Sequence, residues 1–90
     1  MPTYSVEFTT SAEKEFVKLP AKVRSRVAEA LTVLSINPFS ELLNIKKLKG
    51  VDKVFRIRLG DYRIVYEAHQ KRLLVIVIKI GNRREVYRRF

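Results

Sequence analysis

The chain has 90 residues, a length that suits one small domain and is too short for two, so we predict a single domain over residues 1–90. Hydrophobic residues make up 47% and charged residues 31%, which predicts a soluble globular protein. Cysteine is absent and there is one histidine, so we expect no disulfide, no metal and no other cofactor. No apolar run approaches the ~20 residues of a membrane span and no signal peptide is visible, so we expect a cytoplasmic protein.

The net charge of +10 is unevenly distributed along the chain. Residues 1–45 carry five basic and five acidic side chains, whereas residues 46–90 carry fourteen basic and four acidic ones. Such an imbalance favours an anionic partner, with nucleic acid as the first candidate and an acidic protein or a membrane surface next. The alternative is charge that serves only solubility.

The first half of the chain predicts one strand and two helices. Residues 3–9 alternate between apolar and polar side chains, which is typical of an amphipathic strand. Thr10-Ser-Ala-Glu13 is a capping-box pattern and predicts the start of a short helix. Pro20 ends this helix and opens a second one, which Asn37-Pro38 stops.

Three closely spaced strands are predicted in the second half, after a connection over residues 39–50. Residues 53–59 and 62–67 alternate on either side of Gly60-Asp61, which suits a two-residue hairpin turn. A second turn is expected over residues 69–72. The following apolar segment, residues 73–80, predicts a central strand that Gly81-Asn82 breaks.

The predicted order is therefore β-α-α-β-β-β, an α+β fold with both helices on one face of a small, largely antiparallel sheet. We expect the second face of the sheet to be left open.

The predicted hairpin fixes the position of its arginines. A two-residue turn pairs Leu59 with Tyr62 and therefore places Arg58 directly opposite Arg63, with Arg56 on the same face. Like charges in this position destabilise a sheet by a few tenths to about 1 kcal/mol, and function is a common reason to keep them. The alternative is three solvated arginines on an exposed face.

The remaining charged groups limit the chemistry that the chain can perform. We expect three carboxylates to be solvated side chains on the helices: Glu13, Glu15 and Glu29. The sequence therefore shows no carboxylate cluster of the kind that a two-metal nuclease needs. The tail over residues 83–89 is basic and contains Tyr87, which could bind phosphates and stack on a base, although taken alone such a run is more often a solvated tail. Any catalysis would be metal-free, with Arg, Lys and Tyr stabilising charge on a phosphate and moving protons poorly.

Three segments together resemble RelE toxins of the RelE/ParE superfamily of type II toxin–antitoxin systems. They are Lys47-Leu48-Lys49-Gly50, the hairpin over residues 55–66, and the ending Gly81-Asn-Arg-Arg-Glu-Val-Tyr87. The resemblance implies a toxin that enters the ribosomal A site and cuts mRNA by attack of the ribose 2′-hydroxyl on the neighbouring phosphate. It also implies a cognate RelB-like antitoxin that binds the toxin in a hetero-oligomer and blocks it.

The same resemblance assigns the candidate site. Arg63 and Arg83 would hold the scissile phosphate, Tyr87 would stack on a base and assist proton removal, and Arg56 and Arg58 would bind phosphate or help proton transfer. The basic residues expected to contact RNA or the ribosome are Lys46, Lys47, Lys49, Lys53, Arg84, Arg88 and Arg89.

The sequence departs from the family's pattern at three positions. The best-known bacterial relatives have lysines where Arg56 and Arg58 stand, and lysine loses a proton more readily than arginine. Many relatives also have histidine where Asn82 stands, so a histidine proton shuttle is missing here.

Two other functions stay open for the same fold. One is a ParE-type toxin that poisons DNA gyrase without being an enzyme, and the other is an inactive nucleic-acid or protein-binding module. An acidic, amphipathic antitoxin segment would cover the second face of the apolar strand at Leu73 to Ile78, unless the C-terminal tail folds back over it.

Overall fold

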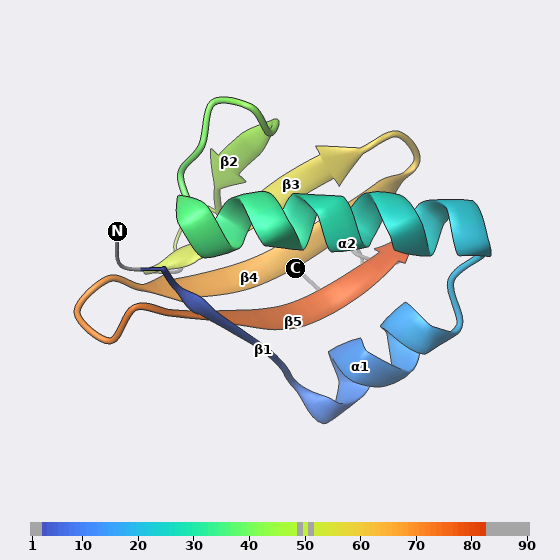
Figure 1. Ribbon diagram of the computed structural model, residues 1–90, viewed down its shortest axis with the longest axis horizontal. Helices are drawn as coiled ribbons and strands as arrows, with labels where there is room; N and C mark the ends of the chain where they lie inside the picture. The colour runs from blue at the N-terminus through green and yellow to red at the C-terminus, as the bar shows by residue number, and fades with distance from the viewer. Residues whose placement is uncertain (1–2, 49, 51, 83–90) are drawn as a thin grey trace.

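The computed structural model describes residues 3–48, 50 and 52–82, and this part of the chain forms a five-stranded sheet with two helices (Figure 1). In chain order the elements are β1 (Ser5–Phe8), α1 (Thr10–Val17), α2 (Ala21–Ile36), β2 (Ile45–Lys47), β3 (Val54–Leu59), β4 (Tyr62–His69) and β5 (Leu74–Asn82). Neither helix is long and apolar enough to cross a membrane.

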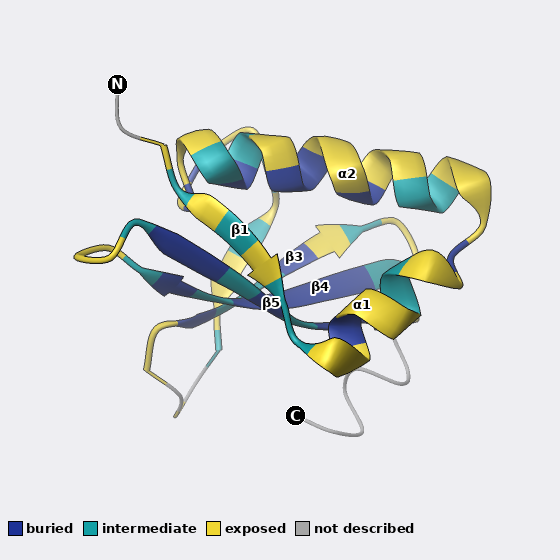
Figure 2. Ribbon diagram, turned by 60° about the horizontal axis from the view of Figure 1, so that its bottom comes forward, coloured by how far each residue is buried: buried dark blue, intermediate teal, exposed yellow. Residues whose placement is uncertain are grey.

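The sheet has the strand order β1-β5-β4-β3-β2. The first strand pairs in parallel with β5, and all other neighbours are antiparallel. Figure 2 shows α2 lying over one face of the sheet, with α1 beside the end of β5. The predicted α+β class, with a largely antiparallel sheet, is therefore confirmed.

The prediction missed the short strand β2. Residues 39–50 were expected to be a connection, but Ile45, Lys46 and Lys47 pair with Ile57, Arg56 and Phe55 of β3. Three residues are too few to produce a recognisable alternation, which is why the pattern did not reveal this edge strand.

The predicted start of the first helix is wrong by one residue. The N-cap is Thr9 rather than Thr10, because the Thr9 hydroxyl accepts a hydrogen bond from the backbone N–H of Ala12 at 3.1 Å. The same hydroxyl donates to the carbonyl of Ile78 at 3.2 Å. The hydroxyl of Thr9 therefore both caps α1 and links the start of this helix to β5.

The main core lies between the helices and one face of the sheet. From α2 it receives Val27 and Leu34, which are fully buried, and from the sheet Ile57, Ile64 and Tyr66. The helix-facing positions of the hairpin are those that the alternation predicted. Pro20 stands at the start of α2 and Asn37 at its end, as expected.

The expectation that the second face of the sheet is open holds for only part of the described residues: Lys46 and Arg58 on this face are exposed, whereas its centre is buried. Val65 is fully buried and Val54 nearly so, and Leu48 and Ile78 pack against them. Ile78 reaches this cluster because the β4–β5 register shifts between Val65 and Tyr66, which leaves Ile78 between two paired positions of β5.

The second turn lies one residue later than predicted, over residues 70–73 instead of 69–72. His69 belongs to β4 and pairs with Leu74, while Gly81 and Asn82 continue β5 instead of breaking it. Backbone pairing with Arg63 and Tyr62 extends β5 to this point.

Candidate functional site

The β3–β4 hairpin has the register that the two-residue turn predicted. Leu59 pairs with Tyr62 and Arg58 with Arg63, on either side of Gly60-Asp61. Gly60 has a φ of 60°, a left-handed conformation that glycine adopts with little strain. The turn residue therefore determines which two arginines face each other.

The three arginines of this face differ in exposure. Arg58 is exposed, Arg56 is half-buried, and Arg63 is only 3% exposed. One guanidinium nitrogen of Arg63 donates to the carbonyls of Gly60 at 3.1 Å and Tyr62 at 3.0 Å. The interpretation as three solvated arginines is therefore wrong for Arg63, which the carbonyl dipoles of its own turn hold in place.

Strand β2 adds a cation to this face. Lys46 is exposed and pairs directly with Arg56. It therefore lies on the same face as Arg56, Arg58 and Arg63, and we call these four residues the basic row. Such a row can bind consecutive phosphates, because arginine donates bidentate hydrogen bonds to phosphate oxygens and lysine adds a compact charge.

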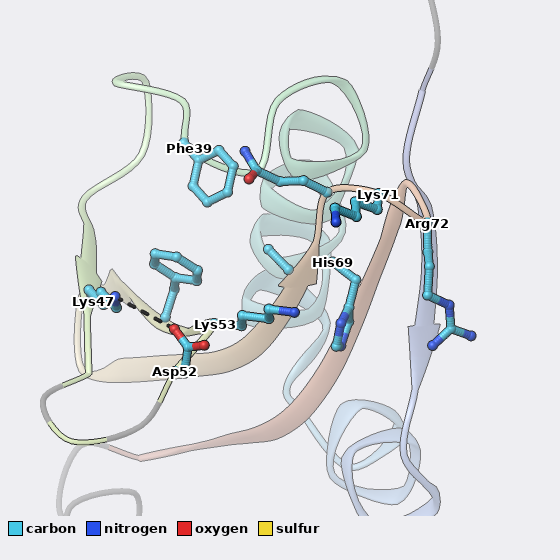
Figure 3. Close-up of a pocket in the computed structure, with 10 residues that line it drawn as sticks. Phe39, Lys47, Asp52, Lys53, His69, Lys71 and Arg72 are labelled. Atoms are coloured by element: carbon cyan, nitrogen blue, oxygen red, sulfur yellow. Dashed lines mark ion pairs between the residues drawn. The ribbon is translucent and has the colours of Figure 1, made fainter.

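Two further basic residues that were expected to bind RNA, Lys47 and Lys53, do not join the basic row. Lys47 pairs with Phe55 and forms a 3.9 Å ion pair with Asp52, and Lys53 is exposed in the turn before β3. Both line a separate pocket at the far end of the hairpin (Figure 3). The predicted RNA-binding residues that the structure describes therefore lie in two locations, Lys46 in the basic row and Lys47 and Lys53 at this pocket.

Six predicted site residues lie outside the described residues: Lys49, Arg83, Arg84, Tyr87, Arg88 and Arg89. The last described residue, Asn82, pairs with Tyr62 at the end of the hairpin where Arg58 and Arg63 lie.

Glu15 and Lys79 form an ion pair that the sequence analysis did not identify. The Lys79 ammonium, 8% exposed, donates to one carboxylate oxygen of Glu15, and the backbone N–H of Ile80 donates to the other at 3.1 Å. The expectation that Glu15 is solvated is therefore wrong. A lysine inside an apolar strand was the available signal, because a buried ammonium needs a partner.

Burial raises the pKa of Tyr66 well above its usual value, since the charged phenolate would be desolvated. Its hydroxyl donates to the carbonyl of Pro38 at 2.6 Å. Tyr66 is thus a neutral structural group of the core and supplies no proton-transfer chemistry. Among residues 3–48, 50 and 52–82, no three histidine or carboxylate side chains gather where they could hold a metal ion.

Comparisons with known proteins agree on one family. Residues 6–87 match the family described as ParE toxin of type II toxin-antitoxin system, parDE. The chain is 33% identical to the mRNA interferase toxin RelE of Escherichia coli, over 93% of this chain and 90% of that protein. It is 32% identical to Toxin RelG of Mycobacterium tuberculosis, over 96% and 98%.

Solved structures give the same result. The toxin of the archaeal RelE–RelB complex from Pyrococcus horikoshii has a TM-score of 0.80 and 29% identity, covering 92% of this chain and 97% of that one. The isolated E. coli RelE toxin has a TM-score of 0.77 and 32% identity, covering 96% and 93%.

Proposed function

This chain belongs to the RelE/ParE superfamily of type II toxins as a RelE-type member, and from that premise we propose that it is a ribosome-dependent mRNA endonuclease. The observation that carries the proposal is the basic row, in which Arg58 and Arg63 face each other at one end of the hairpin. Relatives named mRNA interferase support the same activity. Action on the ribosome would place the protein in the cytoplasm.

In the proposed reaction the 2′-oxygen of a ribose forms a bond to the adjacent phosphorus while the bond to the 5′-oxygen breaks. The products are a cyclic phosphate and a free 5′-hydroxyl. The 2′-hydroxyl proton leaves to a base, and the departing 5′-oxygen gains a proton. The exposed Arg58 would contact the phosphate oxygens, and the buried Arg63 opposite it would add positive charge that stabilises the charge developing there.

The proton transfers need other groups, because arginine stays protonated. We assign base stacking and assistance in proton removal to Tyr87, and a second phosphate contact to Arg83, from their places in the family's C-terminal motif. Arg56 stands where relatives have lysine, so we assign it phosphate binding rather than proton transfer. A partner that positions the substrate would compensate for a weak proton-transfer system.

We also propose an acidic, amphipathic antitoxin as partner in a hetero-oligomer. The complexes of RelE with RelB among the similar structures support this assignment. The basic row offers charge for an acidic segment, and the exposed apolar side chains Val17 and Leu42 offer surface for an amphipathic one.

The second candidate is a toxin that poisons DNA gyrase. The match to the ParE family description over residues 6–87 favours it, and the shared fold does not discriminate between the two activities. An inactive nucleic-acid or protein-binding module of the same fold is the third candidate.

The deciding experiment is a cleavage assay on a defined mRNA, with and without programmed ribosomes, in which primer extension maps the cut. We expect cleavage only with ribosomes, at the codon in the A site. Arg58→Ala should lower the cleavage rate, whereas Lys22→Ala, an exposed cation of α2, should not. No cleavage by folded protein would overturn the proposal, and inhibition of gyrase supercoiling would then support the second candidate.

A further inference from the structure

A basic pocket opens at the end of the hairpin opposite the Gly60-Asp61 turn. It has a volume of about 730 Å³, and its walls come from Phe39 after α2, from residues 47, 52, 53 and 55 and from residues 68–72 (Figure 3). The cations among its lining residues are Lys47, Lys53, Lys71 and Arg72, beside His69 and one carboxylate, that of Asp52. Nothing in the proposed reaction uses this pocket.

The positive charge of the pocket exceeds its negative charge. Asp52 offsets Lys47 through their 3.9 Å ion pair, and the His69 ring lies 2.8 Å from the Glu67 carboxylate. Lys53, Lys71 and Arg72 supply the excess, and all three are exposed. The site therefore attracts an anion.

Backbone hydrogen bonds hold the segments that carry these cations. Lys53 has a φ of 63°, and its carbonyl accepts from the N–H of Ala68 at 3.0 Å. Leu73 has a φ of 48° and donates to the carbonyl of Gln70, which closes the turn that carries Lys71 and Arg72. Left-handed backbone at non-glycine residues is unfavourable and clusters at functional sites.

The apolar wall of the pocket is aromatic. Phe39 is 38% exposed, and its ring meets that of Phe55 edge-on with centroids 5.2 Å apart. Phe55 in turn stacks on the buried ring of Tyr66 at 5.7 Å. Phe39 is thus a surface ring whose inner side packs against the core through Phe55.

We propose that this pocket binds a nucleotide of single-stranded RNA, with the base against Phe39 and the flanking phosphates on Lys53, Lys71 and Arg72. Base stacking on an aromatic ring beside basic side chains is the usual mode of single-strand recognition. An amphipathic helical peptide would place several apolar anchors along a groove, whereas the apolar lining here is two phenyl rings and Ala68.

This site is separate from the basic row. Phe55 and Tyr66 belong to the helix-facing side of the hairpin, whereas Arg56 and Arg58 alternate to the other side. The pocket would therefore hold a different stretch of RNA from the one that is cut, and act as a tether.

The test measures the binding of a fluorescent 12-nucleotide oligouridine to the full chain by anisotropy at several salt concentrations, without ribosomes. We expect K71A/R72A to weaken binding at least fivefold and to lower the salt slope by about 1.4, since each phosphate contact to a single strand contributes about 0.7. K18A/K22A removes the same charge at the opposite end of α2 and should change binding less than twofold. Equal losses in both double variants would overturn the proposal.

A second variant tests the stacking contact. Phe39→Leu keeps an apolar side chain and should weaken RNA binding at least threefold with an unchanged salt slope and an unchanged melting temperature. Unchanged affinity would overturn the role of Phe39. Pocket-dependent binding of polyglutamate without binding of RNA would overturn the proposal in favour of an acidic protein. RNA binding without cleavage in the ribosome assay would contradict only the proposed function.

Discussion

Arg58 and Arg63 occupy directly opposite positions of the β3–β4 hairpin, and their charges repel across the strand pair. Arg63 is buried against the carbonyls of the turn, whereas Arg58 extends into solvent. The hairpin is thus less stable than it would be with a neutral residue at one of the two positions.

Replacing Arg58 should therefore stabilise the protein. We expect Arg58→Thr to raise the free energy of unfolding by a few tenths to about 1 kcal/mol in urea titrations at low salt, while mRNA cleavage falls. The gain should shrink in 1 M salt, because exposed charges are screened. Arg58→Lys keeps the charge and serves as the control; an equal gain in that variant would contradict repulsion as the cause.

The Glu15–Lys79 ion pair should be important for stability. Glu15→Ala leaves a buried ammonium and the N–H of Ile80 without their acceptor, and we expect a loss of about 3–5 kcal/mol in the free energy of unfolding. Lys79→Met removes the charge and fills the space, so its loss should be smaller. Glu29→Ala, at an exposed position of α2, should stay within about 0.5 kcal/mol. Similar losses for Glu15→Ala and Glu29→Ala would contradict the pair's role.

The Tyr66 hydroxyl should contribute through its hydrogen bond to Pro38. Tyr66→Phe keeps the stacked rings but leaves the Pro38 carbonyl without this donor, which should lower the free energy of unfolding by about 1–3 kcal/mol. Tyr4→Phe, at a partly buried position, is the matched control and should change stability less. Chemical denaturation at pH 7 measures both.

The same tyrosine should make stability fall in alkali. Because burial raises the pKa of Tyr66, the folded protein keeps this proton at pH values where the unfolded chain, with a pKa near 10, releases it. The contribution of Tyr66 to the free energy of unfolding is therefore fully present below pH 10. Above pH 10 this contribution falls by up to about 1.4 kcal/mol per pH unit. The difference between wild type and Tyr66→Phe should narrow between pH 9 and pH 11. A constant difference would show that Tyr66 does not titrate differently in the two states.

Gly60 should be hard to replace. Gly60→Ala places a side chain at a φ of 60° and should lower the free energy of unfolding by about 1–2 kcal/mol. Because the Gly60 carbonyl also holds Arg63, we expect cleavage to fall as well. Gly50→Ala is the control: its φ is also positive and its added methyl meets no atom within 4 Å, so it should lose stability but retain activity. Full activity in Gly60→Ala would contradict the link between the turn and Arg63.

The sequence predicted the hairpin well because a two-residue turn leaves one register, and that register determines which residues share a face. It could not predict that Arg63 would be buried, since alternation specifies a face and not what covers it. The Glu15–Lys79 pair and the basic pocket were missed for a different reason. The two residues of the ion pair lie far apart in the chain, and so do pocket residues such as Phe39 and Arg72. Only the tertiary fold brings them together.

The parallel pairing of β1 with β5 also affects how the molecule forms. Ser5 is paired with Leu74, and the Thr9 hydroxyl donates to the carbonyl of Ile78, 69 residues further along the chain. Contacts between such distant segments form late and slowly, because the loop between them must close first. During synthesis β1 has no strand to pair with until β5 has emerged, so the toxin completes its sheet only after residues 74–82 have been translated.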